Sequence, residues 1–361
     1  MDALDAYRGR TVVLTGHTGF KGSWLALWLT ELGARVVGFA LPPEEPSLFE
    51  ACDLRRRITS IEGDVRDLEA LARVFEREQP AIVFHLAAQA IVRSSYELPK
   101  HTFDVNIGGT VNVLECIRRT AATRAAVIVT SDKCYENREW AYGYREDDPM
   151  GGHDPYSASK GAAELVVASY RRSFLSASAG RAFGLATGRA GNVIGGGDFA
   201  RDRIVPDCVR AVTADLPVVV RNPRSIRPWQ HVLEPLHGYL VLGAQLLADP
   251  VRYSGPYNFG PLVLDHVTVG ELVAVLLESW GRGASKLDAQ PAAAKEAGLL
   301  RLACDKAMTE LGWRPRLGVR DAIAWSVEWY RAWHERAPAD QLLEVAARQI
   351  ARYCAAPERT R

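Results

Sequence analysis

The sequence has no excess of charge of either sign and no long apolar run. Its 361 residues include 44 Lys and Arg against 43 Asp and Glu, so the formal net charge is +1. That balance gives no bulk electrostatic reason to bind nucleic acid or an anionic membrane surface. No apolar run reaches the roughly 18 residues that a membrane-spanning helix needs. Residues 1–9 are too polar and mixed for a signal peptide.

Cysteine is also sparse. The six cysteines are scattered, and no two have the C-x-x-C spacing. We therefore expect reduced thiols in a cytoplasmic protein, with no disulfide framework and no metal site. With 48% hydrophobic and 24% charged residues, the composition is typical of a globular protein. The length permits one large domain or two coupled ones.

What the sequence does have is a regular alternation of apolar runs and helical patterns in its first half. The predicted strands lie at 11–15, 36–40, 58–61, 82–86 and 126–129. Helical patterns separate them: one carries Leu25, Trp28, Leu29 and Leu32 and stops at Gly33, and others lie at 68–77 and 103–119. Apolar strands joined by helices predict an α/β protein with a Rossmann-type, doubly wound parallel sheet. Such a sheet binds ligands at the carboxyl ends of its strands.

From about residue 191 the pattern becomes looser and richer in Gly, Pro, Arg and Trp. We interpret residues 1–190 together with about 231–257 as the sheet domain. Residues 191–230 together with 258–335 are predicted to form a smaller, discontinuous C-terminal domain. Residues 336–361 form a basic amphipathic C-terminal tail to which the sequence assigns no role.

Three glycines follow the first predicted strand and begin a helix: Gly16, Gly19 and Gly22. Glycine permits a tight turn, and without a Cβ the backbone N–H groups can approach a phosphate. The positive end of the helix dipole favours the same anion. Between a strand and a helix, this spacing predicts a dinucleotide-binding turn. The weaker alternative is a glycine-rich turn without a ligand.

The adenosine end of such a site is less defined. The second strand runs into Leu41 and Pro42 instead of an acidic residue that would hold the ribose of NAD. No arginine follows to bind a 2′-phosphate, which favours NAD over NADP. Asp64, after the third strand, suits an adenine contact or, equally, the N-cap of a helix.

Two further motifs carry ionisable groups. Tyr156 and Lys160 lie one helical turn apart and can face one site. A free phenol has a pKa near 10, so we expect a nearby ammonium, together with the positive nicotinamide ring of a bound cofactor, to lower the pKa of Tyr156. Ser131, Asp132 and Lys133 follow directly on the fifth strand and could serve three atoms of one substrate. The alternatives, an exposed helical pair and an ordinary turn, are weaker because all these motifs occur together.

Arginines gather in the looser half, at Arg189, Arg203, Arg224 and Arg227, and Asn192 lies among glycines. Guanidinium groups bind diphosphates with two parallel hydrogen bonds. These residues are therefore candidates to hold a nucleotide diphosphate, although ordinary surface arginines are the alternative.

Together the motifs resemble the nucleotide-sugar 4,6-dehydratases, a group of extended short-chain dehydrogenases. The resemblance extends to about residue 335 and is carried by segments 15–24, 85–89, 130–135, 154–160, 189–198 and 224–232. Ser-Asp-Lys at 131–133 is the discriminating motif, because members that act on dTDP-glucose typically have Thr-Asp-Glu. The motif is most similar to that of members acting on CDP-glucose.

The resemblance implies an NAD-dependent hydro-lyase that makes a 4-keto-6-deoxy sugar from a nucleotide sugar, with CDP-glucose expected. It places the enzyme in deoxysugar biosynthesis, such as that of O-antigen lipopolysaccharide. Tyr156 would take the proton of the 4-hydroxyl, with Ser131 sharing the hydrogen bond and Lys160 in support. Asp132 would be the acid at O6. Lys133 would be the base at C5 or, alternatively, a charge that stabilises the enolate.

The resemblance also implies the binding residues and the assembly. The predicted cofactor-binding residues are Thr15, Gly16, Gly19, Phe20, Gly22, Asp64, Val65, Leu86, Ala87, Ala88, Gln89, Tyr156 and Lys160. The predicted substrate-binding residues are Gln89, Ser131, Arg189, Asn192, Arg203, Arg227 and Gln230. Helices 103–119 and 156–173 would pair across a two-fold axis in a homodimer, or in a tetramer built from it.

Two departures from the family pattern leave alternatives open. Pro42 stands where the family tends to place an Asp, which bears on the preference for NAD. Segment 296–305 also differs, so another nucleoside-diphosphate hexose could be the substrate. A sugar-nucleotide epimerase on the same scaffold would not need an acid and a base at C5 and O6. A non-enzymatic NAD-binding protein would need none of the five predicted catalytic residues.

Overall fold

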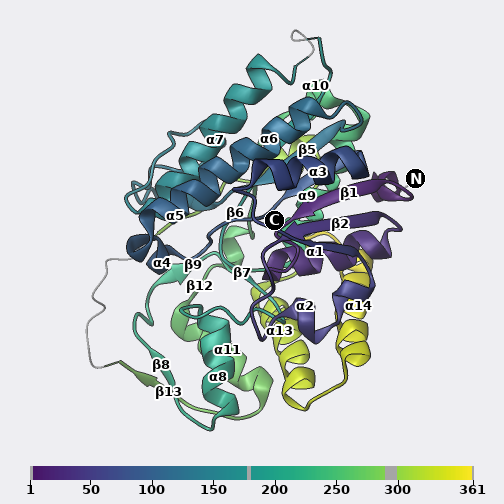
Figure 1. Ribbon diagram of the computed structural model, residues 1–361. Coiled ribbons are helices and arrows are strands. Elements are labelled where there is room, and N and C mark those ends of the chain that lie inside the picture. The colour runs from purple at the N-terminus through teal and green to yellow at the C-terminus, as the bar shows by residue number, and fades with distance from the viewer. Residues whose placement is uncertain (1–2, 177–179, 289–298, 360–361) are drawn as a thin grey trace.

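A computed structural model describes residues 3–176, 180–288 and 299–359. The strands of its central sheet are β1 (Thr11–Thr15), β2 (Arg35–Ala40), β3 (Thr59–Glu62), β4 (Ile82–His85), β5 (Ala125–Val129), β6 (Gly184–Ala190) and β11 (Gly255–Phe259). They are all parallel and lie in the order β11-β6-β5-β4-β1-β2-β3. Because the order reverses between β1 and β4, the sheet is doubly wound, which confirms the predicted fold class (Figure 1).

Helices cover both faces of this sheet (Figure 1). One face carries α3 (Leu68–Glu78), α6 (Gly109–Arg119) and α7 (Pro155–Ser173), and the other carries α1 (Phe20–Glu31) and α9 (Leu233–Ala248). Val13 of β1 belongs to the core under the first group, whereas its neighbours Val12 and Leu14 belong to the core under the second. Burial on both faces explains why the strands form continuous apolar runs.

Other segments of the second half of the chain form a smaller part beside the sheet domain (Figure 1). Its described strands pair as β7 (Val193–Ile194) with β10 (Gln230–His231), β9 (Ile226–Arg227) with β12 (Val267–Thr268), and β8 (Val218–Val220) with β13 (Ser285–Leu287). Its helices are α8 (Ile204–Thr213), α11 (Val269–Trp280), α12 (Asp305–Glu310) and α13 (Val319–His334). The short helices elsewhere are α2 (Leu48–Ala51), α4 (Val92–Glu97), α5 (Pro99–Phe103) and α10 (Pro250–Tyr253).

Two strands of the main sheet are missing from the sequence prediction. Both β6 (GLATGRA) and β11 (GPYNF) are interrupted by glycine, proline or polar residues, so neither forms an apolar run. The predicted helix 103–119 consists instead of the end of α5, a π-helical turn at Asp104–Gly108 and α6.

The C-terminal segment is an integral part of the fold, which corrects its description as a tail. Helix α14 (Ala339–Ala355) packs against α1 and α13 and buries Leu342, Ile350 and Tyr353. The Tyr353 hydroxyl donates a hydrogen bond of 2.8 Å to the buried carboxylate of Glu234 on α9. Within the described residues, no helix combines the length and apolarity needed to cross a membrane.

Candidate active site

The glycine turn lies between β1 and α1, and packing explains two of its three glycines. Gly16 has φ +77°, and a Cβ there would lie 2.6 Å from the backbone nitrogen of Ala87. A Cβ at Gly22 would lie 2.0 Å from the carbonyl oxygen of Gly16. At Gly19 the nearest atom would be 3.4 Å away, an ordinary contact. Gly19 is the N-cap of α1, and no side chain of the described residues caps that end. The first turn of α1 is therefore without a side-chain cap from its N-cap residue, and an anion would suit this end of the helix.

Hydrogen bonds align this turn with the end of β4. The Thr15 hydroxyl lies 2.7 Å from Nδ1 of His85 and accepts a bond of 3.3 Å from the backbone N–H of Ala87. The Asn106 amide exchanges bonds of 2.9 and 3.0 Å with the backbone of Gln89. Two of the segments predicted to bind a dinucleotide are thus held side by side. The Gln89 side chain itself bonds the backbone of Ile91.

Asp64 follows β3, as predicted, and binds Arg66. Its carboxylate accepts bonds of 2.5 and 2.9 Å from that guanidinium, and this pairing holds the pKa of Asp64 below its usual value. The N-cap of α3 is Asp67 instead, so the alternative role for Asp64 is wrong. Val65 packs against Gly109 of α6, where a Cβ would lie 2.7 Å from the valine side chain.

Helix α7 presents Tyr156 and Lys160 on one buried face. The helix begins at Pro155, and the Asp154 side chain caps it by accepting a bond of 2.9 Å from the Ser157 N–H. The Lys160 ammonium donates to the carbonyl oxygen of Val129 at 3.4 Å, at the end of β5. Burial lowers the pKa of Lys160 to about 8. The lysine therefore sits where the sheet ends, as the motif predicts.

In the protein without cofactor, burial has the largest influence on the pKa of Tyr156. Burial raises it to about 12, while the Ser131 hydroxyl and the charge of Arg203 lower it. Lys160 is not among the main influences on Tyr156 in the protein without cofactor, and the lowering expected from the ammonium together with the nicotinamide ring stays a prediction. The physical reason is that desolvation of the phenolate outweighs the nearby positive charge.

The turn after β5 brings a hydroxyl and a carboxyl together. The Ser131 hydroxyl accepts a bond of 3.2 Å from the Lys133 backbone N–H and donates one of 2.9 Å to Oδ1 of Asp132. Burial raises the pKa of Asp132, although Lys133, Ser131 and Lys21 oppose the shift. Its Oδ2 lies so close to Gly191 that a Cβ there would approach it to 2.8 Å. Lys133 is partly buried, and its ammonium makes no ion pair within 4 Å among the described residues.

Lys21 is a site residue that sequence reasoning missed. It lies in the first turn of α1, and the charges of Arg203, Asp132, Lys160 and Asp198 act on it. Burial is the main cause that lowers the pKa of Lys21 to about 8. A lysine between the glycines of an otherwise uncharged turn was the signal available in the sequence.

The prediction for Arg189 needs correction. Its side chain is 3% exposed, and the guanidinium bonds both carboxylate oxygens of Glu164, at 2.9 and 2.8 Å. It also donates to the Tyr135 hydroxyl at 2.7 Å and to the Glu146 carbonyl at 2.8 Å. A guanidinium with these internal partners lies behind the predicted catalytic turn and is not presented to a diphosphate.

The remaining predicted substrate residues surround the strand pair β7–β10. Arg203 pairs with Asp198 at 2.8 Å and acts on both Tyr156 and Lys21. The backbone carbonyl of Asn192 accepts a bond from the Gln230 N–H, and the buried Gln230 amide donates to Phe259 at 3.0 Å. Arg227, on β9, donates to the neighbouring Ile226 carbonyl at 3.0 Å and is partly buried.

Segment 296–305, which bears on the substrate, lies partly outside the described residues, since 296–298 are among those not described. From Leu299 on it runs beside the loop that follows the predicted catalytic turn. The Tyr144 N–H donates to the Arg301 carbonyl at 2.8 Å, and the Ala303 N–H donates to the Tyr144 carbonyl at 2.9 Å. The segment is therefore joined to the loop that leads from Lys133 to α7.

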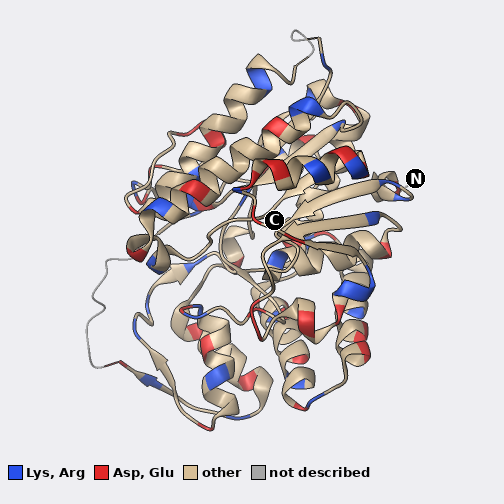
Figure 2. Ribbon diagram, viewed as in Figure 1, with Lys and Arg blue, Asp and Glu red and all other residues tan. Residues whose placement is uncertain are grey.

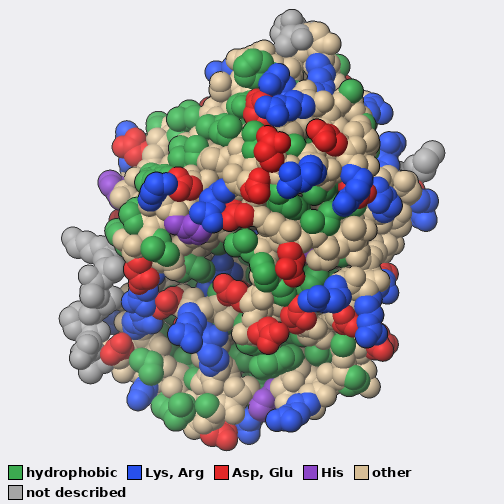
Figure 3. Space-filling model, viewed as in Figure 1, with side chains coloured by type: hydrophobic (Ala, Val, Ile, Leu, Met, Phe, Trp, Pro, Cys, Tyr) green, Lys and Arg blue, Asp and Glu red, His purple; other side chains and the backbone are tan. Residues whose placement is uncertain are grey.

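The surface around this region carries both signs of charge. Figure 2 shows Lys and Arg interspersed with Asp and Glu on the helices of both parts. Figure 3 shows a hollow between the two parts, with basic side chains at its floor and basic, acidic and apolar side chains around its rim. The ribbon diagram, drawn in the same view, shows the strands of the sheet ending on this side (Figure 1).

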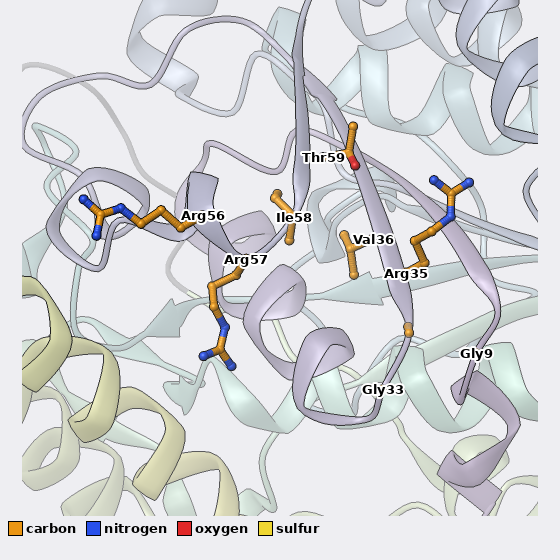
Figure 4. Close-up of a pocket in the computed structure, with 9 residues that line it drawn as sticks. Gly9, Gly33, Arg35, Val36, Arg56, Arg57, Ile58 and Thr59 are labelled. Atoms are coloured by element: carbon orange, nitrogen blue, oxygen red, sulfur yellow. The ribbon is translucent and has the colours of Figure 1, made fainter.

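A second cavity, of about 430 Å³, lies at the opposite ends of the strands. Three arginines surround it (Figure 4), but each is paired with an acidic residue. The pairs are Arg35 with Glu78 at 2.6 Å, Arg56 with Asp53 at 2.6 Å and Arg57 with Glu31 at 2.5 Å. Because β2 begins at Arg35 and β3 at Thr59, this cavity lies away from the edge where ligands bind such sheets.

Comparisons with known proteins identify close relatives. The family model described as GDP-mannose 4,6 dehydratase matches residues 13–325. CDP-glucose 4,6-dehydratase of Salmonella typhimurium is 48% identical over 356 residues, which cover 98% of each chain. Among solved structures, UDP-glucose 4-epimerase of Thermus thermophilus in complex with NAD matches with a TM-score of 0.76 and 25% identity, covering 89% of this chain and 99% of that one. dTDP-glucose 4,6-dehydratase of Bacillus anthracis in complex with NAD has the same fold, with a TM-score of 0.76, 18% identity and coverage of 91% and 98%.

Proposed function

Because the chain belongs to the GDP-mannose 4,6 dehydratase family, we propose that it is an NAD-dependent dehydratase that converts CDP-glucose to CDP-4-keto-6-deoxyglucose. The observation that carries the proposal is the Ser131–Asp132–Lys133 turn at the end of β5, beside Tyr156 of α7. The relative from Salmonella typhimurium, 48% identical along nearly the whole chain, supports the choice of CDP-glucose. The product is a precursor for deoxysugar biosynthesis, such as that of an O-antigen.

NAD is the proposed cofactor, and the glycine turn fits it. A Cβ at Gly19 would make only one contact, at 3.4 Å, and Gly19 begins α1 without a side-chain cap, so a pyrophosphate would bind at this end of the helix. Asp64 and Val65 would lie at the adenine, and Leu86 to Gln89 would line the middle of the dinucleotide. When bound, NAD supplies the hydride acceptor for oxidation at C4 and the hydride donor for reduction at C6.

For the oxidation, Tyr156 would take the proton of the sugar 4-hydroxyl. The Ser131 hydroxyl, which donates to Asp132 in the structure, would support this role by donating its proton to the phenolate of Tyr156 instead. Lys160, one turn further along α7, would add positive charge to the site. Since burial raises the pKa of Tyr156 to about 12, positive charge beside the phenol is needed for rapid proton transfer near neutral pH.

For the elimination, Asp132 would protonate the leaving hydroxyl at C6. Burial raises the pKa of Asp132, which favours the protonated form that an acid requires. Lys133 would remove the C5 proton, which the 4-ketone has made acidic. A base needs a lone pair, so the Lys133 amine must be neutral when it acts, whereas a charged Lys133 would stabilise the enolate instead.

The test is a panel of CDP-, dTDP-, GDP- and UDP-hexoses scored for the alkaline absorbance of a 4-keto-6-deoxy product. We expect the chromophore with CDP-glucose, and its loss in the Tyr156→Phe variant. An epimerised hexose, which has no such chromophore, would contradict the dehydratase assignment. Turnover of another nucleotide sugar in preference to CDP-glucose would contradict the choice of nucleobase.

A homodimer is proposed for the assembly. Helices α5 and α7 and the segment before α5 carry large apolar side chains exposed on the surface: Tyr96, Leu98, Phe103, Leu165 and Phe174. Figure 3 shows apolar side chains gathered over this part of the molecule. Pairing of these helices with those of a second copy would cover them. The six free thiols support a reducing, cytoplasmic location.

A further inference from the structure

Glu164 lies one helical turn after Lys160 on α7, outside the residues that the mechanism uses. Its side chain is 5% exposed and accepts four hydrogen bonds. Oε1 receives them from the Thr130 hydroxyl and from Nε of Arg189, and Oε2 receives them from the Thr187 hydroxyl and from Nη2 of Arg189. With two donors on each oxygen, the acceptor capacity of this buried carboxylate is filled.

The donors to Glu164 come from the ends of two strands. Thr130 follows β5 and directly precedes Ser131, while Thr187 and Arg189 belong to β6. A single carboxylate therefore joins α7, which carries Tyr156, to the strand end that carries the catalytic turn. Buried groups bonded in this way have little freedom to shift, because each lost bond leaves a buried polar atom without a partner.

The network continues on the far side of the turn. Arg189 donates to the Tyr135 hydroxyl at 2.7 Å, and that hydroxyl donates to Oδ1 of Asn258 at 2.8 Å. Tyr135 comes directly after the short 3₁₀ turn Asp132–Cys134. The turn is thus fixed on both sides: Thr130, which precedes it, bonds Glu164, and Tyr135, which follows it, bonds Arg189.

Glu164 also lies close to Lys160 without forming an ion pair with it: the Lys160 ammonium bonds the Val129 carbonyl, and the hydroxyl of the next residue, Thr130, bonds the Glu164 carboxylate. The titratable groups that face Lys160 are Glu164 on its own helix, Cys134 of the catalytic turn, His85 of β4 and Lys21 of α1. Burial raises the pKa of the Cys134 thiol and lowers that of His85 to about 3, so both are neutral near pH 7. Lys21 adds positive charge. Of these groups, the ion-paired carboxylate of Glu164 is the one that favours the ammonium form of Lys160.

We propose that Glu164 is a positioning residue for the oxidation step: it keeps Lys160 an ammonium and holds it, with Tyr156, against the turn at 131–133. The proposal rests on the proposed function only in naming that step as the oxidation of the sugar at C4. Without the carboxylate, the buried ammonium would face Lys21 with no opposing charge, and Lys160 would lose its proton at a lower pH.

The experiment measures the titration of Lys160 in the substrate-free protein. Competitive acetylation with acetic anhydride across a pH series, read by peptide mass spectrometry, reports the fraction of neutral amine. In Glu164→Gln we expect the midpoint for Lys160 to fall by about one pH unit. The matched control is Thr187→Val, which removes one bond to the same carboxylate but keeps its charge, and its midpoint should equal that of the wild type.

Glu164→Gln leaves Arg189 buried without a counter-charge and could fail to fold. The double variant Glu164→Gln with Arg189→Met removes both charges, so no unpaired guanidinium repels the ammonium, and we expect a smaller fall in the midpoint in the same direction. In either folded variant, the rate of NADH formation from CDP-glucose should fall more at mildly alkaline than at mildly acidic pH, with KM unchanged.

An unchanged midpoint in a folded charge-removing variant would overturn the proposal, as would an equal shift in Thr187→Val. A loss of rate that is uniform across pH would assign Glu164 a merely structural role and overturn it as well. If the wild-type protein turned over no nucleotide sugar, the proposed function would fail, whereas the acetylation result would still decide the relation between Glu164 and Lys160.

Discussion

The hydroxyl of Ser131 donates a hydrogen bond of 2.9 Å to Oδ1 of Asp132, the next residue in the chain. One side chain is proposed for the oxidation at C4 and the other for the elimination at C6. Because Ser131 also acts on Tyr156, the turn links the phenol to the carboxyl through a single hydroxyl. Substitutions in the turn should therefore separate the two halves of the reaction.

Asp132→Asn should spare the oxidation and slow the loss of water. An amide cannot donate a proton to the leaving hydroxyl, and a positioned general acid contributes about 100-fold or more. We expect NADH to accumulate in a single turnover with CDP-glucose, measured by its near-ultraviolet absorbance. Failure of NADH to form at all would show that Asp132 serves the oxidation instead.

Lys133→Met and Lys133→Glu should differ if Lys133 is the base. Methionine has no proton acceptor, so elimination should slow about 100-fold or more, whereas glutamate should restore part of the rate. Exchange of the C5 hydrogen with deuterated solvent measures this step. Elimination that survives in the Met variant would rule out an essential base. A Glu variant slower than the Met variant would favour a charged Lys133 that stabilises the enolate.

Gly19→Ala and Gly22→Ala form a matched pair for the cofactor site. A methyl group at Gly19 meets its nearest protein atom at 3.4 Å, whereas one at Gly22 would meet a carbonyl oxygen at 2.0 Å. We expect Gly19→Ala to keep the thermal stability of the apoprotein but weaken NAD binding about tenfold or more, as measured by calorimetry. Gly22→Ala should destabilise the fold by several kcal/mol, on the order of a severe core change. Unaltered NAD affinity in Gly19→Ala would contradict the proposed pyrophosphate position.

Glu234→Gln should change how stability depends on pH. Burial raises the pKa of Glu234 to about 7, above the value near 4.5 of an exposed carboxyl. Between these values the unfolded chain releases the proton while the folded protein retains it, so stability is lost as pH rises through this window. The loss is about 3 kcal/mol above pH 7. Glutamine does not titrate, so the variant should gain stability relative to the wild type as pH rises.

Urea unfolding of both proteins at several pH values checks this expectation, because the other titrating groups cancel in the comparison. Tyr353→Phe is the control, since it removes the hydrogen bond of 2.8 Å to Glu234 but leaves the carboxyl in place. Parallel stability curves for wild type and Glu234→Gln would contradict the raised pKa.

Much of the candidate site was predictable because its parts are local in sequence. Ser131 to Lys133 directly follow a strand. Tyr156 and Lys160 lie one helical turn apart. Local sequence did not predict the partner of Arg189. A guanidinium among glycines and arginines suggests a diphosphate, but its partner Glu164 is 25 residues away in the chain, and no local pattern indicates the pairing.

The sequence by itself determined the order of strands and helices in the first half, the glycine turn and the motifs that follow the strands, because these depend on the spacing of neighbouring residues. Only the tertiary structure decided that β6 and β11 join the sheet, that α14 packs into the core and that Lys21 reaches the site. It also decided that burial raises the pKa of Tyr156. Each of these depends on which distant segments exclude water from a side chain, and that is set by packing in three dimensions, not by the residues on either side.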